Sequence, residues 1–288
     1  MTTAVIGATG RVGSVIVRGV LARGDVVTAL VRDPVKARRV FGEPGGLHIR
    51  ATRLDDPRDL TEALDGIRTV FMAMGSIGIE GVLQRIAINA AAGIPSIEQV
   101  TRLSVLNTSA DSLGINQPAH HSIDRFASST AVPYSTIRPA IFSASLLAAA
   151  REVRASQTWT GLAGSGRMAL IDHRDAAEAG LRVLTDPALW GAHHDLTGPV
   201  AMSWPEALEL LSAELGRPVT FRVAAERQFL ERLTGAGVPA GTAELLITRE
   251  WAILAGENDY TTGAFQQITG RPPRPVAEFL HNYRAEFV

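Results

Sequence analysis

Short apolar segments alternate with amphipathic segments along the first half of the chain. The apolar segments span residues 2–7, 25–31, 47–51, 69–74, 97–103 and 134–137. The first two lack the polar alternation of half-exposed strands, as is typical of parallel strands buried on both faces. Between the first two, Val12, Ile16 and Val20 share one helical face, and Gly24 ends the helix. The alternation predicts an α/β protein with a doubly wound parallel sheet and right-handed crossovers.

The pattern changes past about residue 150 and becomes too irregular for a second nucleotide-binding domain. We therefore predict a dinucleotide-binding domain over residues 1–152 and a smaller α+β substrate-binding lobe over residues 153–288. A strand near residues 193–198 is expected to return to the main sheet. The lobe's expected segments are apolar runs at residues 159–161 and 167–171 and helices that begin near Asp175, Trp204, Ala225 and Gly241.

A glycine-rich turn joins the first apolar segment to the first amphipathic one. Gly7 permits a sharp turn, Gly10 lets the main chain approach a pyrophosphate, and Gly13 lets the helix pack tightly on its strand. The helix N-terminus then directs its free N–H groups at the phosphates. The residues expected to hold the dinucleotide at this turn are Gly7, Thr9, Gly10, Arg11, Val12 and Gly13.

The residue that ends the second strand bears on which dinucleotide binds. An acidic side chain there would hydrogen-bond the ribose 2′-hydroxyl of NAD, but this chain has Arg32. Its guanidinium suits a 2′-phosphate, and Arg11 and Lys36 add positive charge nearby. NADP(H) is therefore predicted in preference to NAD(H). In the alternative interpretation, Arg32 is a solvated residue at a strand end.

Further candidates lie at the carboxyl ends of later strands, where ligands of open α/β sheets bind. Asp55 follows the third strand and either contacts the adenine or caps the next helix. Met74 and Gly75 end the fourth strand, and Gly75 lets the chain pass close to the cofactor. Ser104 follows the fifth strand as a hydrogen-bonding candidate for substrate or nicotinamide, although a polar loop residue is the simpler interpretation.

The chain lacks the tyrosine and lysine, one helical turn apart, that many nucleotide-dependent reductases use for proton transfer. Lys36 is its only lysine. His120 and Asp124 are the candidate catalytic residues, because a spacing of four places both on one helix face. A carboxylate beside an imidazole raises its basicity and suits it to acid–base work near neutral pH. The alternative is a surface pair that stabilises the helix by a few tenths of a kcal/mol.

No metal site is predicted. The run from Asp172 through His173 to Asp175 has ligand residue types, but its compact spacing and an expected cap role for Asp175 favour a structural function. The chain contains no cysteine, which excludes disulfides, thiolate catalysis and thiolate metal sites. It also has no Gly-x-Ser-x-Gly elbow, so serine hydrolysis is not supported.

The composition of the chain restricts the kinds of partner that we expect it to bind. The 288 residues carry a net charge of −1 without a strongly basic region, so neither nucleic acid nor a membrane surface is expected to bind. No apolar run reaches the roughly 20 residues that span a bilayer. The first strand begins too early to leave room for a signal peptide. We expect a cytoplasmic protein with a small-molecule substrate, and a homodimer is compatible with the sequence.

With these motifs the chain resembles the NmrA-like group of atypical short-chain dehydrogenase/reductases. The motifs that carry the resemblance are residues 7–13, 30–34, 132–139 and 197–199 and the His120-x-x-x-Asp124 helix. The resemblance implies an NADP-binding Rossmann domain with a small C-terminal lobe that forms a substrate cleft over the nicotinamide. The group includes quinone, azo-dye and triphenylmethane-dye reductases. In those reductases a glutamate follows the histidine by four residues, whereas Asp124 is one methylene shorter.

The leading hypothesis is an NADPH-dependent reductase that transfers a hydride to a conjugated or aromatic small molecule such as a quinone, an enone or a related pathway intermediate. His120 would assist, oriented by Asp124. One alternative is an NADP(H)-sensing regulatory protein with little turnover, and another is a redox-neutral isomerase or cyclase. A reductase consumes NADPH when substrate is supplied, whereas the alternatives do not.

Overall fold

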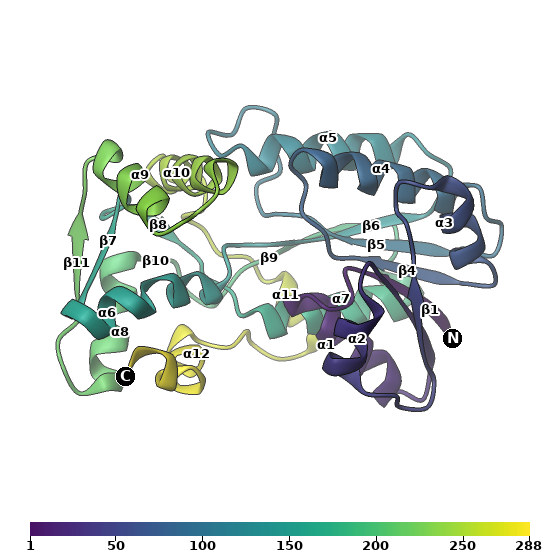
Figure 1. Cartoon of the computed structure of the whole chain (residues 1–288), viewed down its shortest axis with the longest axis horizontal. Helices are drawn as coiled ribbons and strands as arrows, with labels where there is room; N and C mark the ends of the chain where they lie inside the picture. Colours follow the sequence, from purple (N-terminus) through teal and green to yellow (C-terminus); the bar gives the residue numbers. More distant parts are fainter.

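The chain's fold is built on a parallel sheet of seven strands in the order β3-β2-β1-β4-β5-β6-β9 (Figure 1). The computed structural model describes all 288 residues. The strands are β1 (Thr2–Ile6), β2 (Val26–Val31), β3 (Leu47–Ala51), β4 (Thr69–Met72), β5 (Gln99–Leu103), β6 (Tyr134–Pro139) and β9 (His193–Leu196). The strand order reverses between β1 and β4, as in a Rossmann fold. The predicted doubly wound parallel sheet is therefore confirmed.

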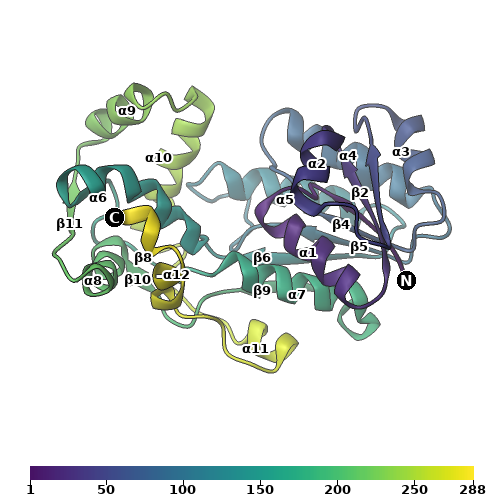
Figure 2. The ribbon, with the colours of Figure 1, turned by 60° about the horizontal axis from the view of Figure 1, so that its bottom comes forward.

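Helices cover both faces of this sheet (Figures 1 and 2). One face carries α1 (Arg11–Ala22), α2 (Pro34–Phe41), α7 (His173–Thr185) and α11 (Ala264–Thr269). The other face carries α3 (Pro57–Leu64), α4 (Ile79–Ala92) and α5 (Asn116–Ser128). Each face has its own buried apolar core, with Phe71 on one side and Met72 on the other. None of the chain's helices is both long and apolar enough to span a bilayer.

Local sequence signals explain where these helices begin. Asp33 caps α2 by accepting a hydrogen bond from the Lys36 N–H at 2.9 Å, and a proline occupies the first helical position. Asp56 caps α3 in the same way, through the N–H groups of Arg58 and Asp59. Both helices therefore start at an Asp-Pro pair, because the carboxylate satisfies free N–H groups and proline lacks one.

The C-terminal lobe packs around its own aromatic core. Trp159 and Trp204 meet edge to face, with 4.8 Å between ring centroids, and Phe279 and Phe287 lie in the same buried cluster. Two small sheets pair β7 with β11 and β8 with β10. The lobe comprises η1 (Ser143–Ala149), α6 (Ala150–Ser156), β7 (Thr158–Gly161), β8 (Arg167–Met168), β10 (Met202–Ser203), α8 (Trp204–Leu215), β11 (Thr220–Val223), α9 (Glu226–Gly235), α10 (Ala240–Leu254), α12 (Val276–Asn282) and η3 (Arg284–Phe287).

The chain crosses between the two halves several times. Helix α7, strand β9 and helix α11 come from the second half of the sequence but pack with the first-half sheet, and α7 also packs against α1. A Cβ on Gly19 of α1 would overlap the Leu181 side chain of α7, so the two helices are in close contact. Three elements that follow residue 152 therefore belong to the main sheet and the helices that cover it.

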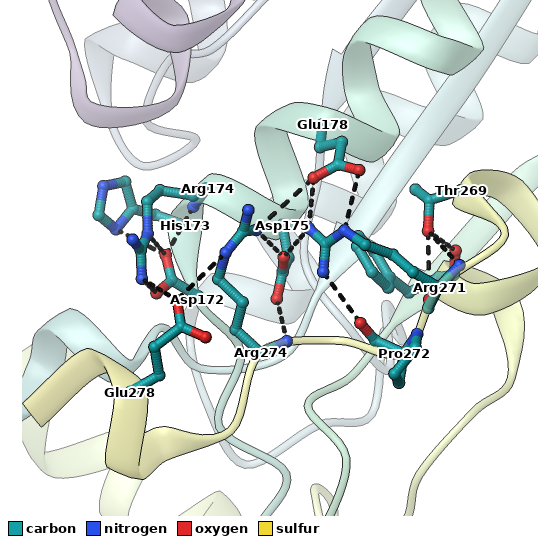
Figure 3. A network of polar contacts seen from close by, with 11 residues as sticks. Asp172, His173, Arg174, Asp175, Glu178, Thr269, Arg271, Pro272, Arg274 and Glu278 are labelled. Atoms are coloured by element: carbon teal, nitrogen blue, oxygen red, sulfur yellow. Dashed lines mark hydrogen bonds and ion pairs between the residues drawn. The ribbon is translucent and has the colours of Figure 1, made fainter.

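An ion network fixes the segment between α11 and α12 to helix α7 (Figure 3). The fully buried Asp175 carboxylate accepts hydrogen bonds from Arg271 Nη2 at 2.8 Å, from the Arg274 N–H at 2.7 Å and from the Arg274 guanidinium. Glu178 also pairs with Arg271. The expected cap role of Asp175 is wrong, because Asp172 caps α7 by accepting from the Arg174 N–H at 2.8 Å. Asp175 instead pairs with two arginines and shares both with Glu178.

Candidate active site

A first cavity of about 320 Å³ lies at the carboxyl ends of β1, β2 and β4. This edge is where ligands of doubly wound sheets bind. Six of the residues predicted to contact a cofactor line it: Gly7, Thr9, Arg32, Lys36, Met74 and Gly75.

Gly7 and Gly13 have the tight surroundings that the sequence predicts. Gly7 has φ of +79°, and a Cβ there would overlap the Ala73 carbonyl group. A Cβ on Gly13 would overlap the Gly7 carbonyl, which explains the tight approach of α1 to β1. Gly10 and Arg11 are exposed at the start of α1, which has no side-chain cap, so its first N–H groups are free for an anion. Val12 is buried in the core and offers only its main chain.

Two cations border the first cavity at the end of β2. Arg32 and Lys36 are exposed at its edge, and neither forms an ion pair or a side-chain hydrogen bond within the chain. Asp33 lies between them, but its carboxylate accepts from the Lys36 N–H as the α2 cap. Two unpaired cations beside a cavity are the donors that a phosphate group requires.

The structure places Asp55 away from the first cavity. Its side chain is 65% exposed and lies 3.6 Å from Arg53, while Asp56 is the residue that caps α3. Thr52 and Leu54 line the cavity beyond β3 instead. The cap role considered for Asp55 is therefore wrong, and its contact with the adenine stays a prediction.

Gly75 has an unexpected neighbour. A Cβ there would overlap the carboxylate of Glu80, which comes from the first turn of α4 and also lines the first cavity. The open space at Gly75 is thus shared with the end of a flexible acidic side chain.

A second cavity of about 360 Å³ lies between the carboxyl ends of β5 and β6 and helix α10 of the C-terminal lobe. It shares Met74 and Gly75 with the first cavity, so the two adjoin at this point. Ser104 and His120 line the second cavity and not the first. The predicted cofactor and catalytic residues are thus divided between two adjoining spaces.

Arg102 of β5 forms a buried hydrogen-bond network with His120 and two other side chains. Its guanidinium is completely buried and donates to Gln84 Oε1 at 2.6 Å, to Asp124 Oδ1 at 2.6 Å and to His120 Nδ1 at 2.5 Å. Gln84 in turn donates to the Gly75 carbonyl at 2.5 Å. This chain of contacts connects the junction of the two cavities to His120.

The expected contact between His120 and Asp124 is absent, because Arg102 lies between them. Burial, reinforced by the Arg102 positive charge, lowers the pKa of His120 well below its ordinary value of 6.5. The prediction that a carboxylate raises this basicity is therefore wrong. Arginine can only donate, so Nδ1 of His120 accepts and the ring proton resides on Nε2. His120 is a neutral hydrogen-bond donor at physiological pH.

Asp124 serves as the acceptor for four surrounding donors. Besides Arg102, its carboxylate accepts from Tyr134 Oη at 2.7 Å, from Ser104 Oγ at 3.0 Å and from Arg138 at 3.4 Å. Burial raises the pKa of Tyr134 above its ordinary value of 10, so the phenol remains a donor. Asp124 therefore fixes the positions of Arg102 and Ser104.

Sequence reasoning missed Arg102 and Gln84. The available signal was an arginine inside the buried strand Gln99–Leu103, because such a charge requires buried partners. Gln84 gave a weaker signal, as a polar residue on the buried face of an alanine-rich helix.

The fold defines a Rossmann-type protein with two adjoining cavities at the carboxyl ends of its strands. The chain belongs to the NmrA-like family, whose model matches residues 1–262. It is 30% identical to an NAD(P)H azoreductase of Xenophilus azovorans over 98% of both chains. It is 25% identical to quinone oxidoreductase 2 of Escherichia coli over 96% of both. The E. coli NADPH-dependent quinone oxidoreductase complexed with NADPH has the same fold, with a TM-score of 0.90 and 24% identity over 98% of this chain and 99% of that one.

Proposed function

We propose that this chain is an NADPH-dependent reductase of conjugated or aromatic small molecules such as quinones. The observation that carries the proposal is the junction at Met74 and Gly75 between a cavity bordered by cations and a cavity that contains His120. The similarity to an azoreductase and a quinone oxidoreductase over nearly the whole chain supports it.

The residues present fit a dinucleotide phosphate. Arg32 and Lys36 would hold a ribose 2′-phosphate, and the glycine turn with the free N–H groups of α1 would hold the pyrophosphate. Met74 and Gly75 would lie beside the nicotinamide, where the first cavity opens toward the second. Bound NADPH would supply a hydride at this junction.

His120 would orient the acceptor in the second cavity. Its Nε2–H can donate to a substrate oxygen that gains negative charge when the substrate is reduced. Arg102 holds the ring in this tautomer, and Asp124 holds Arg102. Asp124 is thus a positioning residue that acts through Arg102, while Ser104 adds a hydroxyl group to the lining of the same cavity.

A binding titration and an activity assay test the proposal together. NADPH and NADH would be titrated against the wild type, Arg32→Ala and the control Arg39→Ala, which removes an exposed arginine of α2 outside the cavity. We expect Arg32→Ala to weaken NADPH binding by about 5- to 30-fold, with little effect on NADH, because one exposed charge-assisted contact contributes about 1–2 kcal/mol.

NADPH oxidation would then be followed with 2-methyl-1,4-naphthoquinone as the acceptor. Acceptor-dependent oxidation is the expected result. Tight NADPH binding without oxidation by any acceptor in a quinone panel would contradict the reductase proposal and favour the dinucleotide-sensing alternative. Equal effects of Arg32→Ala and Arg39→Ala would remove Arg32 from the cofactor site.

A further inference from the structure

The far wall of the second cavity carries an arginine with a free buried donor. Arg249 of α10 lines the cavity, and its Nε is buried without a hydrogen-bond partner. The rest of the guanidinium is held in place, because Nη2 donates to Glu250 at 2.8 Å and the group lies 5.7 Å from the centre of the Trp204 ring. Arg249 is therefore a positioned donor.

Asn258 supplies a second unsatisfied donor in the same cavity. Its side chain is 1% exposed, and Nδ2 has no hydrogen-bond partner. Buried donors are rarely left unsatisfied, since each unmade hydrogen bond costs about 1–3 kcal/mol. Arg249 and Asn258 both line the second cavity, and each has one buried donor without a partner, which points to a ligand that accepts from both side chains.

The charge of the residues that line the second cavity favours an anionic ligand, although Arg249 also pairs with the buried Glu250 behind it. Arg249 is its only charged lining residue, and no carboxylate lines it. The first cavity differs, because Asp33 and Glu80 line it beside its cations. The side chains of Phe142, Leu245 and Leu246 complete the second cavity with apolar surface that suits a flat ring.

We propose that the second cavity selects conjugated acceptors that carry an anionic substituent, such as a carboxylate, sulfonate or phosphate. Arg249 and Asn258 bind the anion, and His120 donates to the reacting oxygen. This inference rests on the proposed reductase function for its reaction, but the anion site itself can be tested by binding alone.

The probes are 1,4-naphthoquinone-2-sulfonate and the uncharged 2-methyl-1,4-naphthoquinone. Their dissociation constants would be measured by calorimetry with NADP⁺ present, and kcat/KM would be measured with NADPH. The variants are Arg249→Met, Arg249→Lys and Asn258→Ala, with Arg222→Met as a control that removes an exposed C-terminal-lobe arginine outside the cavity. Comparing the two probes in each variant cancels their different intrinsic reactivity.

We expect Arg249→Met to weaken sulfonate binding about 10-fold or more relative to the uncharged quinone. Asn258→Ala should weaken it severalfold without changing any charge, and Arg222→Met should leave the ratio unchanged. Arg249→Lys retains a partner for the buried Glu250 and should lie between wild type and Arg249→Met, which keeps the test valid if Arg249→Met folds poorly.

Two results separate the failure of this inference from that of the reductase proposal. If Arg249→Lys and Asn258→Ala change both probes equally, or neither, the anion site is wrong even where both quinones are reduced. If neither quinone is reduced but the sulfonate still binds through Arg249 and Asn258, the anion site stands and the reductase proposal fails.

Discussion

Replacement of Arg102 with methionine tests the buried network that holds His120. The change removes a charge that is completely buried, together with three donated hydrogen bonds. Breaking a buried ion pair costs about 3–5 kcal/mol, and each acceptor left unsatisfied costs about 1–3 kcal/mol. Asp124 retains Tyr134 and Ser104 as donors, and these terms do not add fully. We expect the free energy of unfolding to fall by about 3–5 kcal/mol.

Urea unfolding followed by tryptophan fluorescence and circular dichroism measures this loss. The control is Arg68→Met, which breaks an ion pair with Glu98 in which the two side chains are 54% and 41% exposed. An exposed pair contributes no more than about 1 kcal/mol. The double variant Arg102→Met/Asp124→Asn also removes the carboxylate charge. Its free energy of unfolding should therefore fall by less than that of Arg102→Met alone. A loss for Arg102→Met no larger than that of the control would refute the reasoning.

The ion network at α7 and the burial of His120 give two more predictions. Asp175→Asn should lower the free energy of unfolding by about 2–3 kcal/mol, which is less than for a fully buried pair because Arg271 and Arg274 are partly exposed. The loss should be larger than that caused by Glu178→Gln. Thermal or urea unfolding that gives the two variants equal losses would contradict this prediction. His120 has a lowered pKa in the folded chain, so its imidazole is protonated in the unfolded chain first as the pH falls below about 6.5. Below that pH the free energy of unfolding therefore decreases by up to about 1.4 kcal/mol per pH unit. His120→Gln should remove this part of the acid sensitivity, and unchanged urea midpoints between pH 7 and pH 5 in both proteins would be evidence against a buried neutral imidazole.

The parts of the fold that the sequence predicts are those governed by short-range chemistry. The Asp33-Pro34 and Asp56-Pro57 pairs start α2 and α3 because a cap and a proline act within a few residues. Gly7 and Gly13 shape the turn because a Cβ at either position would overlap main-chain atoms. The largely apolar runs of β1 and β2 likewise indicate buried central strands. The edge strands β3 and β9 carry polar residues and are partly exposed, so this rule does not identify them.

The same rules do not predict contacts between residues that are far apart in the sequence. His120 and Asp124 share a helix face, but the space between them is filled by Arg102 from a strand that is 18 and 22 residues away along the chain. Helix spacing cannot reveal that a third residue enters from the sheet. Asp175 shows the same limit, because its arginine partners lie 96 and 99 residues later.

The position of Arg102 also bears on which acceptors the site can reduce. A histidine beside a carboxylate could be protonated and could pass its proton to the reduced substrate. A histidine whose Nδ1 accepts from a buried guanidinium is held neutral, so its Nε2–H stabilises a developing oxyanion without readily giving up its proton. Such a site favours acceptors whose reduced anion is already stabilised by conjugation, as in a quinone, and disfavours simple ketones that require a proton during hydride transfer. On the proposed function, Arg102 therefore sets the class of substrate as well as the orientation of His120.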